Sequence, residues 1–184
     1  MSLLGFCEWL ASTGWSIALH ESLYVYPLVE TTHVLSLLLF VGTVCLVDLR
    51  LLGFLFRDVA VSEVTGRILP WTVAGFTIAV VTGALLFFAI PVRTYQSVFF
   101  RIKVVMLLVA GVNALLFHRH AASTAPAWDR LTTPPRRVRA AGAVSLFAWT
   151  TVIVMGRMIA YNWFDCDHQP QSAFVNWLAG CVLP

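Results

Sequence analysis

Four long apolar stretches, separated by short polar segments, dominate the pattern of this chain. They cover residues 26–56, 68–90, 98–117 and 142–161. A helix needs about 20 apolar residues to cross the hydrocarbon core of a bilayer, and each stretch reaches or exceeds that length. The pattern therefore predicts an all-α integral membrane protein, with a bundle of four transmembrane helices in a single membrane domain over residues 1–184.

The two ends of the chain follow a different pattern. Residues 3–20 place Glu8, Ser12 and Ser16 four apart among large apolar side chains, which makes one polar stripe on a helix. We expect residues 1–22 to form an amphipathic helix in the membrane interface, with a fifth membrane span as the alternative. Residues 162–184 follow the last apolar stretch and are expected to form a periplasmic segment.

Composition agrees with a membrane protein. The chain is 59% hydrophobic and only 11% charged, with a mean hydropathy of +0.83, whereas an average soluble domain has about 25% charged residues. The net charge of +3 does not call for a nucleic-acid partner, because cytoplasmic loops of membrane proteins are rich in Lys and Arg.

The basic residues also predict an orientation. Eight of the twelve Lys and Arg residues lie around the first and third connections. They are Arg50, Arg57, Arg67, Arg119, Arg130, Arg136, Arg137 and Arg139. The positive-inside rule places these connections in the cytoplasm and both termini on the periplasmic side.

Three of the four cysteines fall on the predicted outer side. A disulfide between Cys166 and Cys181 is expected there, which leaves Cys7 unpaired. The alternative is that Cys166 and His168 hold copper, because thiolate and imidazole suit that soft metal.

Five ionisable residues lie within or beside the apolar stretches. They are Glu30, His33, Arg101, Lys103 and Arg157. A charge at the bilayer centre costs about 2.5–3.5 kcal/mol on insertion scales, so such residues usually face a partner, a cavity or a cofactor. Helix directions bring these five to a similar depth near the outer boundary, with His33 about 7–8 Å below the surface at 1.5 Å per residue. This layer is the predicted functional site.

Three interpretations of the layer remain open. Glu30 could pair with Arg157 or Lys103 and fix the helix register. His33 could be a neutral histidine that accepts a hydrogen bond from a threonine or a backbone group. The third interpretation is a porphyrin, with the iron on His33 and its propionates on Arg101, Lys103 and Arg157, because arginine binds carboxylates in a bidentate manner and histidine ligates haem in helical bundles.

His118, at the inner end of the third stretch, is a second candidate ligand. Ala114 and Gly111, one and two turns earlier, leave space beside its ring, although small residues at this spacing also allow close helix packing. His33 and His118 are separated by about 20 Å along the membrane normal, so they cannot ligate one haem.

Two haems, one near each surface, would therefore need further ligands. His20, His120 or a neighbouring subunit could supply these ligands. Arg50 is a further candidate for a propionate, and the alternative is an interfacial charge pair of Asp48 with Arg50. Met155 and Met158 are candidate soft ligands, with packing as the alternative.

Some activities find no support in the sequence. No phosphate-binding loop, dinucleotide fingerprint, HExxH motif or nucleophile elbow is present. Ordinary kinase and hydrolase functions are therefore not indicated.

Several short motifs carry a family resemblance. They are Trp9-Leu10, Pro27-x-x-Glu30-x-x-His33-Val34-Leu35, Asp48-Leu49-Arg50-Leu51-Leu52-Gly53, Leu69-Pro70-Trp71, Phe100-Arg101-x-Lys103 and Gly156-Arg157. Over residues 6–161 the chain resembles small bacterial multi-pass inner-membrane proteins of unassigned function. More distantly, His33 and Lys103 are similar to positions in copper-resistance D type proteins and in HemJ-type protoporphyrinogen oxidases, which bind haem b. The resemblance implies tetrapyrrole or copper handling in a four-helix bundle.

The leading hypothesis is a haem-b-binding protein, with one or two haems, that transfers electrons within or across the bacterial inner membrane. We expect a homo-oligomer in the lipid bilayer, with a quinone or a redox protein as partner, no nucleic acid, and membrane oxidoreductase activity left open. The alternatives are a copper-handling protein that uses Glu30, His33, Cys166 and His168, and a non-catalytic accessory subunit.

Overall fold

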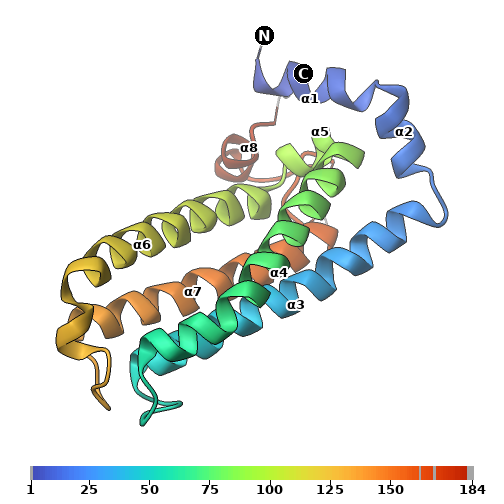
Figure 1. The fold of residues 1–184 in the computed structure, drawn as a ribbon. Helices are drawn as coiled ribbons and strands as arrows, with labels where there is room; N and C mark the ends of the chain where they lie inside the picture. The colour runs from blue at the N-terminus through green and yellow to red at the C-terminus, as the bar shows by residue number, and fades with distance from the viewer. Residues whose placement is uncertain (1, 162, 168, 182–184) are drawn as a thin grey trace.

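Four long helices form the body of the protein (Figure 1). The computed structural model describes residues 2–161, 163–167 and 169–181. The long helices are α3 (Val25–Leu52), α4 (Val61–Ala89), α6 (Val98–Trp128) and α7 (Arg136–Met158). These helices are long and apolar enough to cross a membrane, and the described residues contain no strand. The all-helical fold class and the four candidate spans are therefore confirmed.

The long helices pack in an open order, α4 on α3, α3 on α7 and α7 on α6. Within the described part of the chain, α4 and α6 are not closely packed along their length, although the rings of Phe87 and Phe100 stack with 5.6 Å between their centroids. The closest approach is between α3 and α4, where a Cβ on Gly75 would lie 2.8 Å from the backbone nitrogen of Phe40. Only glycine allows two helix backbones to come this close.

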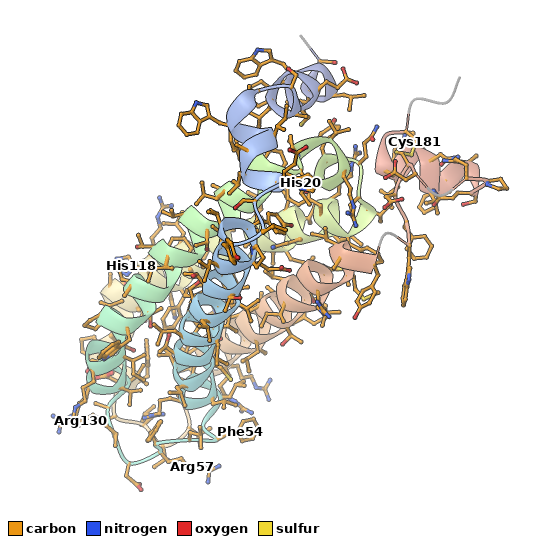
Figure 2. The ribbon with its side chains drawn as sticks, turned by 90° about the vertical axis from the view of Figure 1, so that its right-hand side faces the viewer. His20, Phe54, Arg57, His118, Arg130 and Cys181 are labelled. Atoms are coloured by element: carbon orange, nitrogen blue, oxygen red, sulfur yellow. A yellow bond between two sulfur atoms is a disulfide. The ribbon has the colours of Figure 1, made fainter. Side chains whose placement is uncertain are left out.

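The short helices gather at one end of the bundle, which we call the terminus end (Figure 1). They are α1 (Leu3–Ala11), α2 (Gly14–His20), α5 (Pro91–Tyr95) and α8 (Ala173–Ala179), and a short 3₁₀ helix, η1 (Ile159–Tyr161), continues α7. Connections 53–60 and 129–135 lie at the opposite end, the loop end. Figure 2 shows Arg57 and Arg130 at the loop end and Cys181 at the terminus end.

The N-terminal segment differs from the prediction of one continuous helix. The hydroxyls of Ser12 and Thr13 donate to the carbonyls of Trp9 and Leu10, both at 2.7 Å, and Thr13 caps α2. Such side-chain bonds to the backbone compete with helix continuation. With nine and seven residues, α1 and α2 are not among the candidate membrane spans, so the structure gives the alternative of a fifth span no support.

The four long helices extend beyond the predicted stretches at the loop end. α4 begins at Val61 rather than 68, α6 ends at Trp128 rather than 117, and α7 begins at Arg136 rather than 142. Asp129 caps α4, because its Oδ1 accepts from the backbone nitrogen of Ser62 at 2.7 Å. Hydropathy marks the apolar part of a helix, whereas hydrogen bonds and packing decide where the helix ends.

Proline and glycine mark the helix ends less simply than expected. Pro70 lies inside α4, which membrane helices tolerate because neighbouring groups satisfy the freed carbonyl. Gly53 ends α3 instead of residue 56, with φ +80°. A left-handed C-cap of this kind favours glycine.

Large apolar side chains cover the outer faces of the long helices. Leu38 is 73% exposed, Leu108 65% and Phe147 66%. Water would oppose this arrangement, whereas lipid would solvate it. The faces are compatible with a multi-pass membrane protein.

Candidate functional site

His33 on α3 is held by a hydrogen bond from α4. Its Nδ1 lies 2.9 Å from Oγ1 of Thr82. The single hydroxyl proton of Thr82 goes to the carbonyl of Ile78, at 2.6 Å. With that proton used, Oγ1 can accept the Nδ1 proton of His33, and this arrangement corresponds to the Nδ1–H tautomer of the imidazole.

Gly83 makes room for the His33 ring. A Cβ on this residue would lie 3.1 Å from Cε1 and 3.7 Å from Nδ1 of His33. The ring thus rests on the backbone of α4, directly beside its Thr82 partner. Two consecutive residues of α4 fix both the position and the tautomer of the imidazole.

Lys103 reaches the same layer from α6. Its Nζ lies 3.3 Å from where a Cβ would stand on Gly156 of α7, and it is close enough to His33 to act on it electrostatically. His33, Thr82, Lys103 and Gly156 therefore bring all four long helices together. We call these four residues and Gly83 the histidine layer.

Other residues predicted for this layer lie elsewhere. Glu30 is exposed on α3, and among the described residues the only ion pair is Arg67 with Glu63, at 2.7 Å. The predicted pairing of Glu30 with Arg157 or Lys103 is therefore wrong. Glu30 precedes His33 by three residues, and this spacing turns the two side chains about 60° apart on a helix.

Arg157 and Arg101 make their contacts at the terminus end. Arg157 donates from Nη2 to the hydroxyl of Tyr161 at 3.2 Å and lies over that ring, 5.2 Å from its centroid. Arg101 lies over the ring of Tyr95 at 5.1 Å and packs against Gly180, while its buried Nε has no hydrogen-bond partner. Arg101 thereby joins α6 to α5 and to the end of α8.

The other described histidines do not converge on His33. His118 is exposed on α6, and His120, also on α6, is partly buried. His20 is exposed and meets the ring of Tyr26 edge-on, with 6.0 Å between centroids. Tyr26 precedes His33 by seven residues, about 10 Å along the helix. Figure 2 shows His20 and His118 far from each other along the bundle.

The predicted disulfide is present between Cys166 and Cys181, with 5.4 Å between the Cα atoms. Cys166 therefore has no thiolate to offer copper, and His168 lies outside the described residues. Nowhere in the described ranges do three His, Cys, Asp or Glu side chains gather as ligands for a metal ion. Cys7 is unpaired and buried, as expected.

Arg50 has a structural position at the loop end. It is 0% exposed. Its Nε donates to the carbonyl of Val59 at 2.9 Å, and its Nη2 donates to the carbonyl of Leu131 at 3.0 Å. The predicted charge pair with Asp48 is absent from the described structure, because side chains two residues apart on a helix do not face each other.

The sequence allowed a threonine as the partner of a neutral His33, and the structure has one, but it did not identify Thr82 as that threonine. A threonine inside an apolar helix usually bonds its own preceding turn, which Thr82 also does, so no pattern marked it. Gly83 and Gly156 gave only a weak signal, because small residues in membrane helices more often mean helix packing.

Comparison with known proteins identifies a family without an activity. A family of unknown function (DUF6644) matches residues 8–162. No curated protein matches the chain, and no solved structure matches it. The expected resemblance to uncharacterised proteins thus has support, whereas these comparisons provide no link to copper-resistance D or HemJ-type proteins.

Proposed function

The chain belongs to the DUF6644 family of unknown function, and we propose from its own residues that it binds haem b through His33 and transfers electrons within or across a membrane. The observation that carries this proposal is the contact of the His33 Nδ1 with Thr82, whose own proton goes to Ile78; a histidine that donates from Nδ1 in this way would bind iron through Nε2. Histidine ligands in metal sites almost always donate their other ring N–H to such a partner.

The charge of the histidine layer also suits a haem. Lys103 has no acidic partner among the described residues, although an unpaired cation within an apolar bundle is costly. A haem propionate would provide the missing negative charge. The accessory-subunit alternative, which requires only an internal ion pair, does not account for this excess of positive charge.

Haem is favoured over a copper ion because of the number of protein donors required. A porphyrin supplies four nitrogens, so one or two axial side chains suffice. A bare copper ion takes several protein donors, and no group of three ligands forms within the described residues. The copper site predicted from Glu30, Cys166 and His168 also lacks its thiolate ligand, because Cys166 is in a disulfide.

The proposal also places the protein in the bacterial inner membrane as a homo-oligomer. Arginines at the loop end favour a cytoplasmic loop end and a periplasmic terminus end, in the bacterial inner membrane. Only one histidine stands in the layer, so the second axial ligand would come from another copy of the chain. His118, exposed near the loop end, would hold a second haem between subunits.

Titration of haem into detergent-purified protein tests the role of His33. His33→Ala should lose the Soret band of bound haem, whereas His20→Ala, a histidine change about 10 Å further along the bundle, should keep it. His33→Gly with added imidazole separates ligand loss from misfolding, because imidazole should restore the band. Full haem binding by His33→Ala would overturn the proposal.

A further inference from the structure

A cavity of about 610 Å³ lies between the long helices, on the loop-end side of the histidine layer. It lies within the range of about 300–1,000 Å³ that is usual for small-molecule sites. Phe40, Phe76 and Trp149 form an aromatic wall, with the Phe40 ring centroid 5.2 Å from that of Phe76 and 4.7 Å from that of Trp149. Aromatic walls of this kind suit a planar ring better than a flexible chain.

Asp48 is the acidic group of the cavity. Its side chain lines the cavity and is only 4% exposed, and its Oδ2 has no hydrogen-bond partner. Ser145, whose side chain hydrogen-bonds with the Asp48 carboxyl group, and Asn113 also line the cavity. The Nδ2 of Asn113 donates a hydrogen bond to the carbonyl of Ala141 at 3.0 Å. The side-chain oxygen of Asn113 is therefore a second possible acceptor.

An unsatisfied buried carboxyl oxygen is costly, and a donor from a ligand would remove that cost. The two acceptors, on Asp48 and Asn113, would be satisfied by a ligand head group that carries hydroxyl donors. The aromatic wall favours a ligand whose hydroxyls are attached to a planar ring.

The cavity is partly open to its surroundings. α4 and α6 both contribute to its lining but are not closely packed beside it. Gly111 of α6 stands at this opening, exposed, and a Cβ there would meet nothing within 4 Å. A lipid-soluble molecule could therefore enter sideways between the two helices.

We propose that this cavity binds a lipid-soluble quinol, with a ring hydroxyl donating to Oδ2 of Asp48 and the ring beside Phe40 and Trp149. No residue of the histidine layer lines this cavity. The quinol proposal is therefore independent of whether His33 binds a haem. A lipid acyl chain is the competing occupant, and it would use neither Asp48 nor Asn113.

The test measures binding of a decyl-substituted benzoquinol to the full chain in phosphatidylcholine nanodiscs, with empty nanodiscs subtracted. The dimethyl ether of the same quinol is the matched probe, because it has the same ring and tail without hydroxyl donors. Asp48→Leu removes the acceptor. Gly111→Phe fills the opening, and Gly42→Phe is its control, because Gly42 is an equally open helix position on α3 outside the cavity.

We expect the ether to bind roughly tenfold or more weakly than the quinol, and Asp48→Leu to weaken quinol binding by a similar factor. Gly111→Phe should abolish binding, whereas Gly42→Phe and His33→Ala should leave it unchanged. Equal binding of quinol and ether, or unchanged binding by both Asp48→Leu and Gly111→Phe, would overturn the proposal and indicate a lipid-filled groove. Haem loss in His33→Ala is read separately, so the two proposals fail independently.

Discussion

Thr82 accepts the Nδ1 proton of His33 at 2.9 Å, so a residue of α4 selects the tautomer of a residue of α3. Each helix supplies half of a unit that neither could form alone. The proposed haem site uses the other ring nitrogen, Nε2.

Thr82→Val should weaken haem binding without removing it. Valine keeps the shape of threonine but loses the acceptor, and such changes around metal ligands typically cost about 10–100-fold in affinity. Thr82→Ser retains the hydroxyl and should bind within a few-fold of the native protein. Haem titration of the two variants checks this, and equal affinities would show that the hydrogen bond has no role in ligation.

Gly83→Ala should disturb the same site by contact. The new Cβ would stand 3.1 Å from Cε1 of His33, so the ring must move by a few tenths of an ångström. We expect a smaller loss of haem affinity than for Thr82→Val, on the order of tenfold or less. Gly66→Ala is the control on the same helix, because its Cβ meets nothing within 4 Å. If both alanine variants bind haem alike, the His33 ring does not rest on Gly83 during binding.

Arg50→Met should destabilise the loop end. The substitution removes hydrogen bonds to Val59 and Leu131, each worth about 1.5–3 kcal/mol for a charged donor. Thermal unfolding in detergent should therefore show a clear drop in the midpoint. Arg57→Met, also at the loop end, is the comparison, because Arg57 donates only within its own turn, to the carbonyl of Gly53. A drop of the same size in both variants would contradict the special role of Arg50.

Cys7 should react slowly with alkylating reagents. Burial, and to a lesser extent the charge of Glu8, raise the pKa of the Cys7 thiol, so less thiolate is present at any given pH. In a Cys45→Ser background, the pH profile of iodoacetamide labelling should be displaced above that of a free cysteine. Glu8→Gln should move the profile part of the way back. A profile at or below that of free cysteine would disprove this account of the thiol.

Much of the fold could be predicted from the sequence, because apolar length alone identifies helices that can cross a membrane. The disulfide of Cys166 with Cys181 followed from counting cysteines on one predicted side. Helix ends could not be predicted in this way. The capping of α4 by Asp129 and the hydrogen bond from Arg50 to the carbonyl of Leu131 join segments far apart in sequence.

The candidate site was predictable only at the level of depth. Helix directions and rise per residue correctly placed His33 and Lys103 in one layer, but they could not tell which way each side chain turns. Glu30 and Arg157 have a similar depth and yet face outward. Thr82 could not be identified from the sequence, because its role depends on a contact with His33 of the neighbouring helix α3.

The central claim is tested most directly by the absorption spectrum of the purified protein, produced with haem supplied, first air-oxidised and then reduced with dithionite. Native protein should show a Soret band and sharp reduced α and β bands, and His33→Ala prepared in parallel should lack them. A flat visible spectrum of the native protein, or identical spectra for the two proteins, would contradict haem binding through His33.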